Sequence, residues 1–223
     1  MIDMHSHFFP SITRAQAQSV DSERAPWLSV DPDGRSGKIM LGDKPFRPVN
    51  RVLREAHARV AELDAMGVQP QIVWATPVMF GYAWEAARAA DWAAHMNQQA
   101  LAFCAAHPAR RKALAQVPLQ DLKLACAEAT RATAAGCVGV QIGNHVGPSS
   151  YARRFHVDSA VFSAGALRLL TDVMGVDRVM LGSDYPFPLG EQRIGQLIAD
   201  AAAFNAADRQ RMRRSNAEAF FSL

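Results

Sequence analysis

Cysteine is scarce in this chain of 223 residues. It occurs only as Cys104, Cys126 and Cys137, an odd number in which no two residues form a C-x-x-C pair. This pattern argues against a disulfide framework and favours a reducing, cytoplasmic environment.

Long apolar runs are also lacking. The longest, residues 72–84, is interrupted by Pro77 and Gly81 and is too short to span a membrane. Met1 leads directly into a predicted strand bearing Asp3, without the basic and apolar segments of a secretory leader. We therefore expect a soluble protein with no membrane partner.

Charge of one sign does not accumulate anywhere along the sequence. The 24 Lys and Arg and 21 Asp and Glu give a formal net charge of +3, and no run of five like charges occurs. A nucleic-acid partner is not indicated. The small positive excess suits an anionic small molecule at least as well.

The length bounds the organisation of the chain. With 223 residues, 49% of them hydrophobic, it is long enough for one well-buried core and short for two domains. We expect a single domain over residues 1–223.

Two histidines and one carboxylate stand where apolar strands end. His5 and His7 lie at positions i and i+2 of the first strand, so both side chains point to one side. Asp184 follows the apolar run 179–182 near the other end of the sequence. These are ligand types of catalytic Zn²⁺ sites. The alternatives are a solvated histidine pair, and a helix cap or turn at Asp184.

Strands and helices alternate through most of the sequence, which is typical of a parallel α/β barrel. We expect strands at 1–7, 71–75, 114–117, 138–142, 155–161 and 178–182. Helices are expected at 48–66, 85–107, 121–136, 163–174, 194–204 and 208–221. Residues 8–48 form an irregular inserted lobe, in which 38–41 and 44–47 flank Gly42 as a small hairpin over the barrel mouth.

The alternation breaks once. Between the strands at 138–142 and 155–161 there is no helix, whereas parallel neighbours need a crossover of about a dozen residues. The two strands are therefore antiparallel or are not neighbours. About six strands are predicted, although a (β/α)₈ barrel has eight strands and about 250 residues.

Five segments resemble the 2-amino-3-carboxymuconate-6-semialdehyde decarboxylase family of the amidohydrolase superfamily. They cover essentially the whole chain, and the last is the most distinctive. The segments are IDMHSHFFP at 2–10, ATPVMF at 75–80, LAQVPLQ at 114–120, GVQIG at 139–143 and VMLGSDYPFPLGE at 179–191.

The resemblance implies a metal-dependent barrel and a carboxy-lyase activity. His5, His7 and Asp184 match metal ligands, Arg47 matches an arginine that binds a substrate carboxylate, and Phe187 matches an apolar wall residue. A guanidinium pairs a carboxylate bidentately, which supports the role of Arg47. The implied cofactor is one Zn²⁺ ion that activates water, and the family implies a homodimer.

The sequence departs from the family between Val146 and Ser149. The family's fifth and sixth strands carry a His-Pro-Trp-Asp segment with a third histidine ligand and a His-Gly-Gly-Gly segment with the catalytic base, and neither occurs here. The missing crossover helix is therefore the trace of an internal deletion. The catalytic base is unknown. His145 is a candidate substitute, but a solvated loop histidine is the better explanation of this residue.

Two functions of different class follow. The first is Zn²⁺-dependent decarboxylation of 2-amino-3-carboxymuconate 6-semialdehyde to 2-aminomuconate 6-semialdehyde, in tryptophan or nitroaromatic catabolism. The second is an inactive shortened homologue that at most associates with other subunits; another hydrolase chemistry of the superfamily is a third. With two strands missing we expect an open sheet with exposed edges, because a barrel is held by a closed ladder.

Overall fold

A computed structural model of the chain describes residues 1–143, 155–161 and 163–223. Its strands are β1 (Asp3–Phe8), β2 (Pro26–Val30), β3 (Ser36–Leu41), β4 (Lys44–Asn50), β5 (Gln71–Ala75), β6 (Arg111–Ala115), β7 (Gly139–Val140), β8 (Val157–Asp158) and β9 (Val179–Met180). Its longer helices are α1 (Arg14–Val20), α2 (Ala56–Ala65), α3 (Ala86–Ala105), α4 (Leu122–Ala134) and α5 (Ala164–Met174). Short helices complete the chain: η1 (Arg51–Leu53), η2 (Pro77–Met79), η4 (Val176–Arg178), α6 (Gln196–Asp200), α7 (Ala206–Gln210), the π-helical η5 (Arg211–Ser215) and α8 (Asn216–Phe221).

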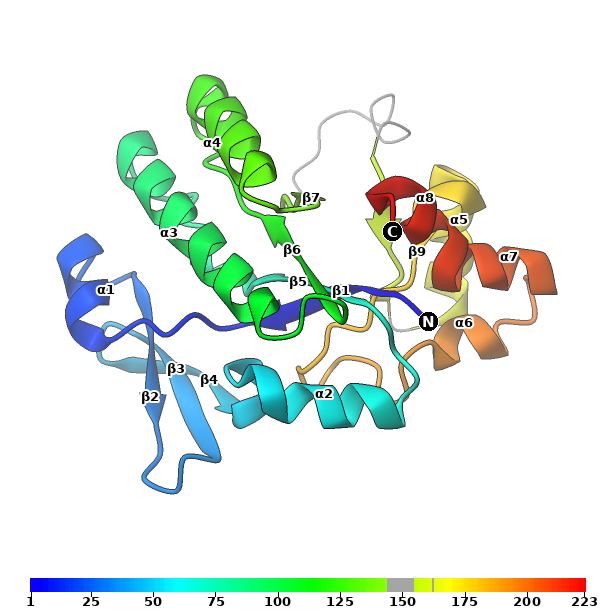
Figure 1. Ribbon diagram of the computed structural model, residues 1–223, viewed down its shortest axis with the longest axis horizontal. Helices are drawn as coiled ribbons and strands as arrows, with labels where there is room; N and C mark the ends of the chain where they lie inside the picture. Colours follow the sequence, from blue (N-terminus) through cyan, green and yellow to red (C-terminus); the bar gives the residue numbers. More distant parts are fainter. Residues whose placement is uncertain (144–154, 162) are drawn as a thin grey trace.

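The centre of the molecule is a parallel sheet in the order β1-β5-β6-β7 (Figure 1). Every residue of β5 is buried, as expected of a parallel strand covered on both faces. The predicted strand at 114–117 begins three residues earlier than expected, because Arg111 pairs in register with Gln71 of β5. The other boundaries of this sheet agree with the sequence pattern to within a few residues.

The segment after β9 runs beside β1. The Met4 N–H donates to the Leu181 carbonyl at 2.7 Å, and the His7 N–H donates to the Tyr185 carbonyl at 2.9 Å. On the other side, β8 pairs with β9 in parallel. These contacts place the chain around β9 next to β1, as the last and first strands lie in a closed barrel. Residues from both ends of the sequence therefore meet at one rim.

The sheet is open in the part of the chain that the structure describes. No pairing joins β7 to β8, and both strands are only two residues long. Val140 is 38% exposed, and Ile142 is half-buried. The prediction of an incomplete barrel with six strands of this type is therefore confirmed for the described residues.

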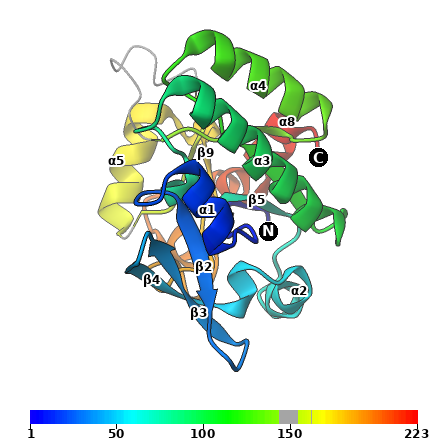
Figure 2. The same cartoon turned by 90° about the vertical axis from the view of Figure 1, so that its left-hand side faces the viewer.

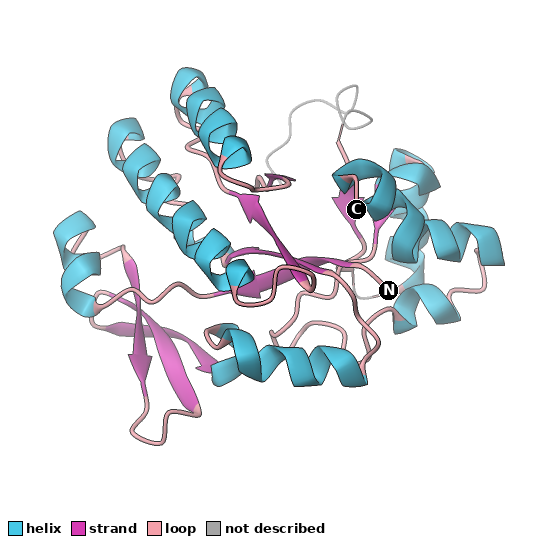
Figure 3. Cartoon of the chain, viewed as in Figure 1, coloured by secondary structure: helices cyan, strands magenta, loops and turns pink. Residues whose placement is uncertain are grey.

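The hairpin predicted after the first strand is present within a larger unit. β2, β3 and β4 form an antiparallel sheet with Trp27 opposite Met40. Figure 3 shows this small sheet apart from the central strands. Pro45 and Pro48 lie in β4, an edge strand, where a missing N–H is tolerated.

The expectation that residues 8–48 are irregular outside the hairpin was wrong. Helix α1 begins at a capping box, in which Thr13 and Gln16 bond each other's backbone N–H groups. The Trp27 indole donates to the Gly42 carbonyl at 2.8 Å and anchors β2 to the hairpin turn. Local capping and this anchor order a stretch that its glycines had marked as loop.

Several predicted helix ends are confirmed by their caps. The side chains of Asp121 and Ser163 accept from the backbone N–H groups of Leu124 and Ala166 and begin α4 and α5. Gly67 has a φ of 66° just after α2, the left-handed conformation that ends helices. The helix predicted at 194–204 is shortened to α6, whereas the one predicted at 208–221 is present as α7, η5 and α8, which follow one another without a break.

The helices cover the sheet from two sides. Helices α3 and α4 lie side by side along β5, β6 and β7, and α5 to α8 gather beside β9 (Figure 1). Helix α1 and the small sheet lie at one end of the molecule in Figure 1, and Figure 2, turned by 90°, shows that end facing the viewer. None of the described helices is long and apolar enough to cross a membrane.

Candidate metal centre

Strand β1 presents two histidines to one side. The hydroxyl of Ser6, between them, donates to the Ile72 carbonyl at 2.7 Å and so faces β5 instead. The pairing of β1 with β5 shifts register between Asp3 and Ser6. The imidazole rings of His5 and His7 are left in contact edge to face, at a centroid distance of 4.9 Å.

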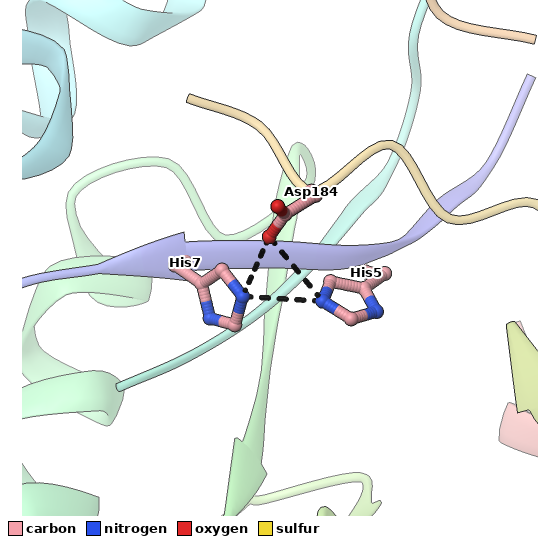
Figure 4. Close-up of side chains that lie close together, drawn as sticks. All are labelled: His5, His7 and Asp184. Atoms are coloured by element: carbon pink, nitrogen blue, oxygen red, sulfur yellow. Dashed lines mark hydrogen bonds and ion pairs between the residues drawn. The ribbon is translucent and has the colours of Figure 1, made fainter. Parts of the chain in front are cut away.

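Asp184 comes to the same point from the chain after β9. Its backbone has a φ of 58°, and its N–H donates to the His5 carbonyl at 2.9 Å, which fixes the turn against β1. Its Oδ1 lies 3.0 Å from His7 Nε2 and 3.6 Å from His5 Nε2 (Figure 4). The two Nε2 atoms are 3.1 Å apart. The structure therefore brings together the three residues that the sequence singled out.

The geometry of this triad fits a divalent metal ion. Ligand atoms around a tetrahedral ion with bonds of about 2.0–2.1 Å stand roughly 3.3 Å from one another. The three separations here bracket that value, and two imidazole nitrogens with one carboxylate oxygen form a common set for zinc and similar metals. In the ranges that the structure describes, it is the one group of three such residues that could hold a metal ion.

Burial and charge set the protonation of the triad. Burial lowers the pKa of His7 to about 4, whereas the carboxylates of Asp158 and Asp184 outweigh burial at His5 and raise its pKa to about 10. Burial also acts on Asp184, but hydrogen bonds from both histidines outweigh it and hold its pKa well below its usual range. The carboxylates of Asp158 and Asp184 thus favour a positive charge at His5. A metal ion bound in place of the His5 proton would supply that charge.

Asp3 supports the site from beneath. It is buried, and it accepts hydrogen bonds from the Ser183 hydroxyl at 2.6 Å, the Gln71 amide at 2.9 Å and the His5 N–H at 3.2 Å. Burial raises the pKa of Asp3 to about 6, against the opposing effect of these donors. Asp3 therefore ties β1, β5 and the turn before Asp184 to one another.

Asp158 is a residue of the site that sequence reasoning missed. Its Oδ2 lies 2.8 Å from His5 Nδ1, on the ring edge opposite the triad. The available signal was a lone carboxylate within the apolar run 155–161, which that reasoning treated only as a strand.

Arg47 and Phe187 meet beside the triad. The Arg47 guanidinium carbon lies 4.7 Å from the centroid of the Phe187 ring, and that ring lies 5.3 Å from the ring of His7. Arg47 comes from β4 of the small sheet, and Phe187, three residues after Asp184, is buried. The small sheet thus places the Arg47 guanidinium near the triad.

A large cavity lies beside the two histidines, in the gap of the sheet between β7 and β8. It has a volume of about 910 Å³ and is lined by His5 and His7, whereas Asp184, Arg47 and Phe187 are not among its described lining residues. Its walls are mostly aromatic and aliphatic, with Trp74, Phe80, Phe155, Phe220 and Phe221 among them. Such a cavity is large enough for a drug-sized organic molecule.

Two features of the sequence analysis are not placed by the structure. His145, the candidate substitute base, and the junction from Val146 to Ser149 lie outside the described residues.

At the end of β7 the described residues are Gln141, Ile142 and Gly143, which offer no carboxylate or lysine to bridge a second metal ion. This composition suits a site for a single ion.

Comparison with known proteins identifies a family and several relatives of the chain. The chain matches the amidohydrolase family over residues 2–157 and 149–223. It is 41% identical over 80 residues to the 2-amino-3-carboxymuconate-6-semialdehyde decarboxylase of Dictyostelium discoideum, which is 36% of this chain and 22% of that protein. It is 38% identical over 72 residues to the Caenorhabditis elegans enzyme of the same name, which is 32% of this chain and 18% of that protein. The matches thus span only about a fifth of the length of these relatives.

Solved structures share the fold at low identity. The 5-carboxyvanillate decarboxylase of Sphingomonas paucimobilis superposes with a TM-score of 0.72 at 16% identity, covering 100% of this chain and 99% of that one. A dihydroxybenzoic acid decarboxylase from Polaromonas, solved with bound manganese, has a TM-score of 0.68 at 14% identity and covers 100% and 96%. At such identity the likeness concerns the fold alone. The family match over both parts of the sequence identifies the chain as a member of the amidohydrolase family.

Proposed function

We propose that this protein is a metal-dependent carboxy-lyase that removes CO₂ from an anionic, unsaturated organic acid. The observation that carries the proposal is the convergence of His5, His7 and Asp184, together with the apolar cavity of about 910 Å³ that the two histidines line. The names of the matched relatives support decarboxylation in particular.

His5, His7 and Asp184 would hold one divalent ion. A bound ion would supply Lewis-acid polarisation and a fixed point for orienting the substrate. We propose Zn²⁺, because two imidazoles and a carboxylate suit it. Manganese is the alternative to test, since it is the ion bound in the Polaromonas structure.

The substrate-binding roles fall to Arg47 and Phe187. The Arg47 guanidinium can pair a carboxylate bidentately, and the Phe187 ring between it and His7 forms an apolar wall. The aromatic lining of the cavity supports a planar, conjugated substrate. We propose 2-amino-3-carboxymuconate 6-semialdehyde, converted to 2-aminomuconate 6-semialdehyde, as in the named relatives.

A second function is favoured by the open sheet. Val140 is exposed at the edge of β7, and among the described residues no strand pairs with β7 on the side away from β6. An inactive homologue that associates with other subunits through these edges is the competing proposal.

Turnover measured against metal content separates the two. The purified protein, stripped with a chelator and reloaded with Zn²⁺ or Mn²⁺, is given freshly generated semialdehyde while CO₂ release and loss of absorbance are followed. We expect turnover that scales with metal content and disappears in Asp184→Ala. A chain that binds one ion per protomer but releases no CO₂ would favour the inactive homologue. The same assay is repeated with 5-carboxyvanillate as an alternative substrate.

A further inference from the structure

Asp158 lies on the far side of His5 from the other two members of the triad. Its Oδ2 is 2.8 Å from His5 Nδ1, while His5 Nε2 faces His7 and Asp184. The two ring nitrogens of His5 are therefore directed to different groups. A histidine that binds a metal through one nitrogen commonly donates its other N–H to a carboxylate, which fixes the tautomer and the ring orientation.

The second histidine has no such support. Nδ1 of His7 is buried like that of His5, but among the described residues it has neither a hydrogen-bond partner nor a carboxylate beside it. Its ring is held by aromatic contacts instead, with Trp74 at a centroid distance of 5.0 Å and Phe187 at 5.3 Å. Any effect of a carboxylate on ring orientation is therefore confined to His5.

The backbone around Asp158 is built to hold the carboxylate in place. Asp158 pairs with Met180 of β9, and its Oδ1 accepts the Ala160 N–H at 2.9 Å. Only Oδ2 is left to face His5. The contact between Asp158 Oδ2 and His5 Nδ1 is close enough for an ion pair. Its geometry does not meet the criteria for a hydrogen bond.

Gly182 makes the approach of the two side chains sterically feasible. A Cβ on Gly182 would lie 2.5 Å from the His5 Cβ and 2.6 Å from the Asp158 Cβ, closer than real side chains come. The side chains of β1 and β8 thus meet over a position that has none.

We propose that Asp158 is a positioning residue that holds the His5 ring in the tautomer and orientation needed to bind a metal through Nε2. The inference rests on the metal-dependent function proposed above. The proposal also gives β8, at the edge of the open sheet, a role in the site. Asp158 on β8 would orient the metal-binding His5 on β1.

The test measures metal binding, with no activity needed. Wild-type protein, Asp158→Asn and the matched control Asp177→Asn, an exposed carboxylate on η4, are titrated with Zn²⁺ against a chromophoric chelator. We expect Asp158→Asn to lose about 10–100-fold in Zn²⁺ affinity, the usual cost of removing such a partner. Asp177→Asn should stay within threefold of wild type.

The outcomes distinguish this inference from the proposed function. Wild-type protein that fails to bind Zn²⁺ or Mn²⁺ would overturn the proposed function, and this inference with it. Wild-type binding that Asp158→Asn leaves unchanged would overturn the inference alone.

A second measurement covers the case in which Asp158→Asn fails to fold. Long-range ¹H–¹⁵N spectra of zinc-loaded wild-type protein, assigned with His5→Gln, should show a proton on His5 Nδ1. Zinc bound through Nδ1 would overturn the proposal.

Discussion

The Ser183 hydroxyl donates to the Asp3 carboxylate at 2.6 Å, and its backbone N–H donates to the same carboxylate at 3.1 Å. Two residues at opposite ends of the sequence are thereby locked together, each within two positions of a member of the triad. The same Ser183 oxygen accepts the Tyr185 N–H at 3.1 Å.

Ser183→Ala should destabilise the protein. The substitution removes a hydrogen bond to a charged group and leaves the Tyr185 N–H without its acceptor, so we expect the free energy of unfolding to fall by about 1.5–3 kcal/mol. Urea denaturation in the presence of EDTA measures it without a contribution from bound metal. The exposed Ser19→Ala in α1 is the control and should change stability by less than about 0.5 kcal/mol. Equal effects of the two variants would contradict the role of the Asp3 contact.

Gly182→Ala should damage the triad more than the fold. The new methyl group would meet the Cβ atoms of His5 and Asp158 at 2.5 and 2.6 Å, and overpacking of this kind costs about 1–3 kcal/mol. We expect Zn²⁺ affinity to fall at least tenfold, measured by chelator competition. Gly165→Ala in α5 is the matched control, because the nearest atom to its Cβ would be 4.0 Å away and stability should be unchanged or slightly higher. Normal zinc binding by Gly182→Ala would show that β1 and β8 can move apart.

Arg47→Ala should weaken carboxylate binding and spare the metal. Loss of a charge-assisted pair costs about 1.5–3 kcal/mol, which corresponds to roughly 10–100-fold in the dissociation constant of a carboxylate ligand. Arg47→Lys should recover only part of it, because an ammonium lacks the planar fork. Calorimetry with an unreactive substrate analogue, run beside a Zn²⁺ titration, measures both. The exposed Arg51→Ala should alter neither, and parallel loss of both affinities in Arg47→Ala would argue against a substrate role.

The cysteines should differ in reactivity. Burial raises the pKa of Cys104 to about 12 and that of Cys137 to about 11, whereas Cys126 is exposed. The thiolate is the nucleophile, so at pH 8 a thiol reagent should label Cys126 in the folded protein and the other two only in denaturant. Peptide mass spectrometry reads out the sites.

The same pKa shifts have a consequence for stability. Both thiols release their protons more readily in the unfolded chain, so their contribution to stability is complete below about pH 9 and declines as the pH rises toward 11–12. Denaturation midpoints for Cys104→Ala should fall less steeply over this interval than those of the wild type.

The open edge should promote association. Val140 is exposed at the end of β7 and lines the cavity, and unpaired edges with apolar residues favour self-association. We propose that the wild-type chain is a homo-oligomer or aggregates, and that Val140→Lys shifts it toward monomer in light scattering. Val173→Lys, on the exposed face of α5, is the control. A wild-type monomer that melts cooperatively would refute this prediction.

Much of the fold follows from local sequence signals. The buried run 71–75, the caps Asp121 and Ser163 and the left-handed Gly67 act over a few residues, and the structure places them as predicted. Helix α1 carried the same kind of signal in Thr13 and Gln16, but the surrounding glycines and prolines obscured it. Strand ends were less predictable, because register depends on the neighbouring strand: Gln71 fixes the start of β6 at Arg111.

The sequence by itself determined the strands of the central sheet, most of the longer helices, the family and the two short motifs that supply the triad, but not α1 or β2. His5 and His7 share a side because side chains alternate along a strand, and this requires no knowledge of the rest of the chain. The tertiary structure decided which distant residues meet. The contact of Asp158 with His5, the stacking of Arg47 on Phe187 and the cavity in the gap of the sheet depend on strand order and side-chain packing. These are set by the whole chain together, so no local pattern encodes them.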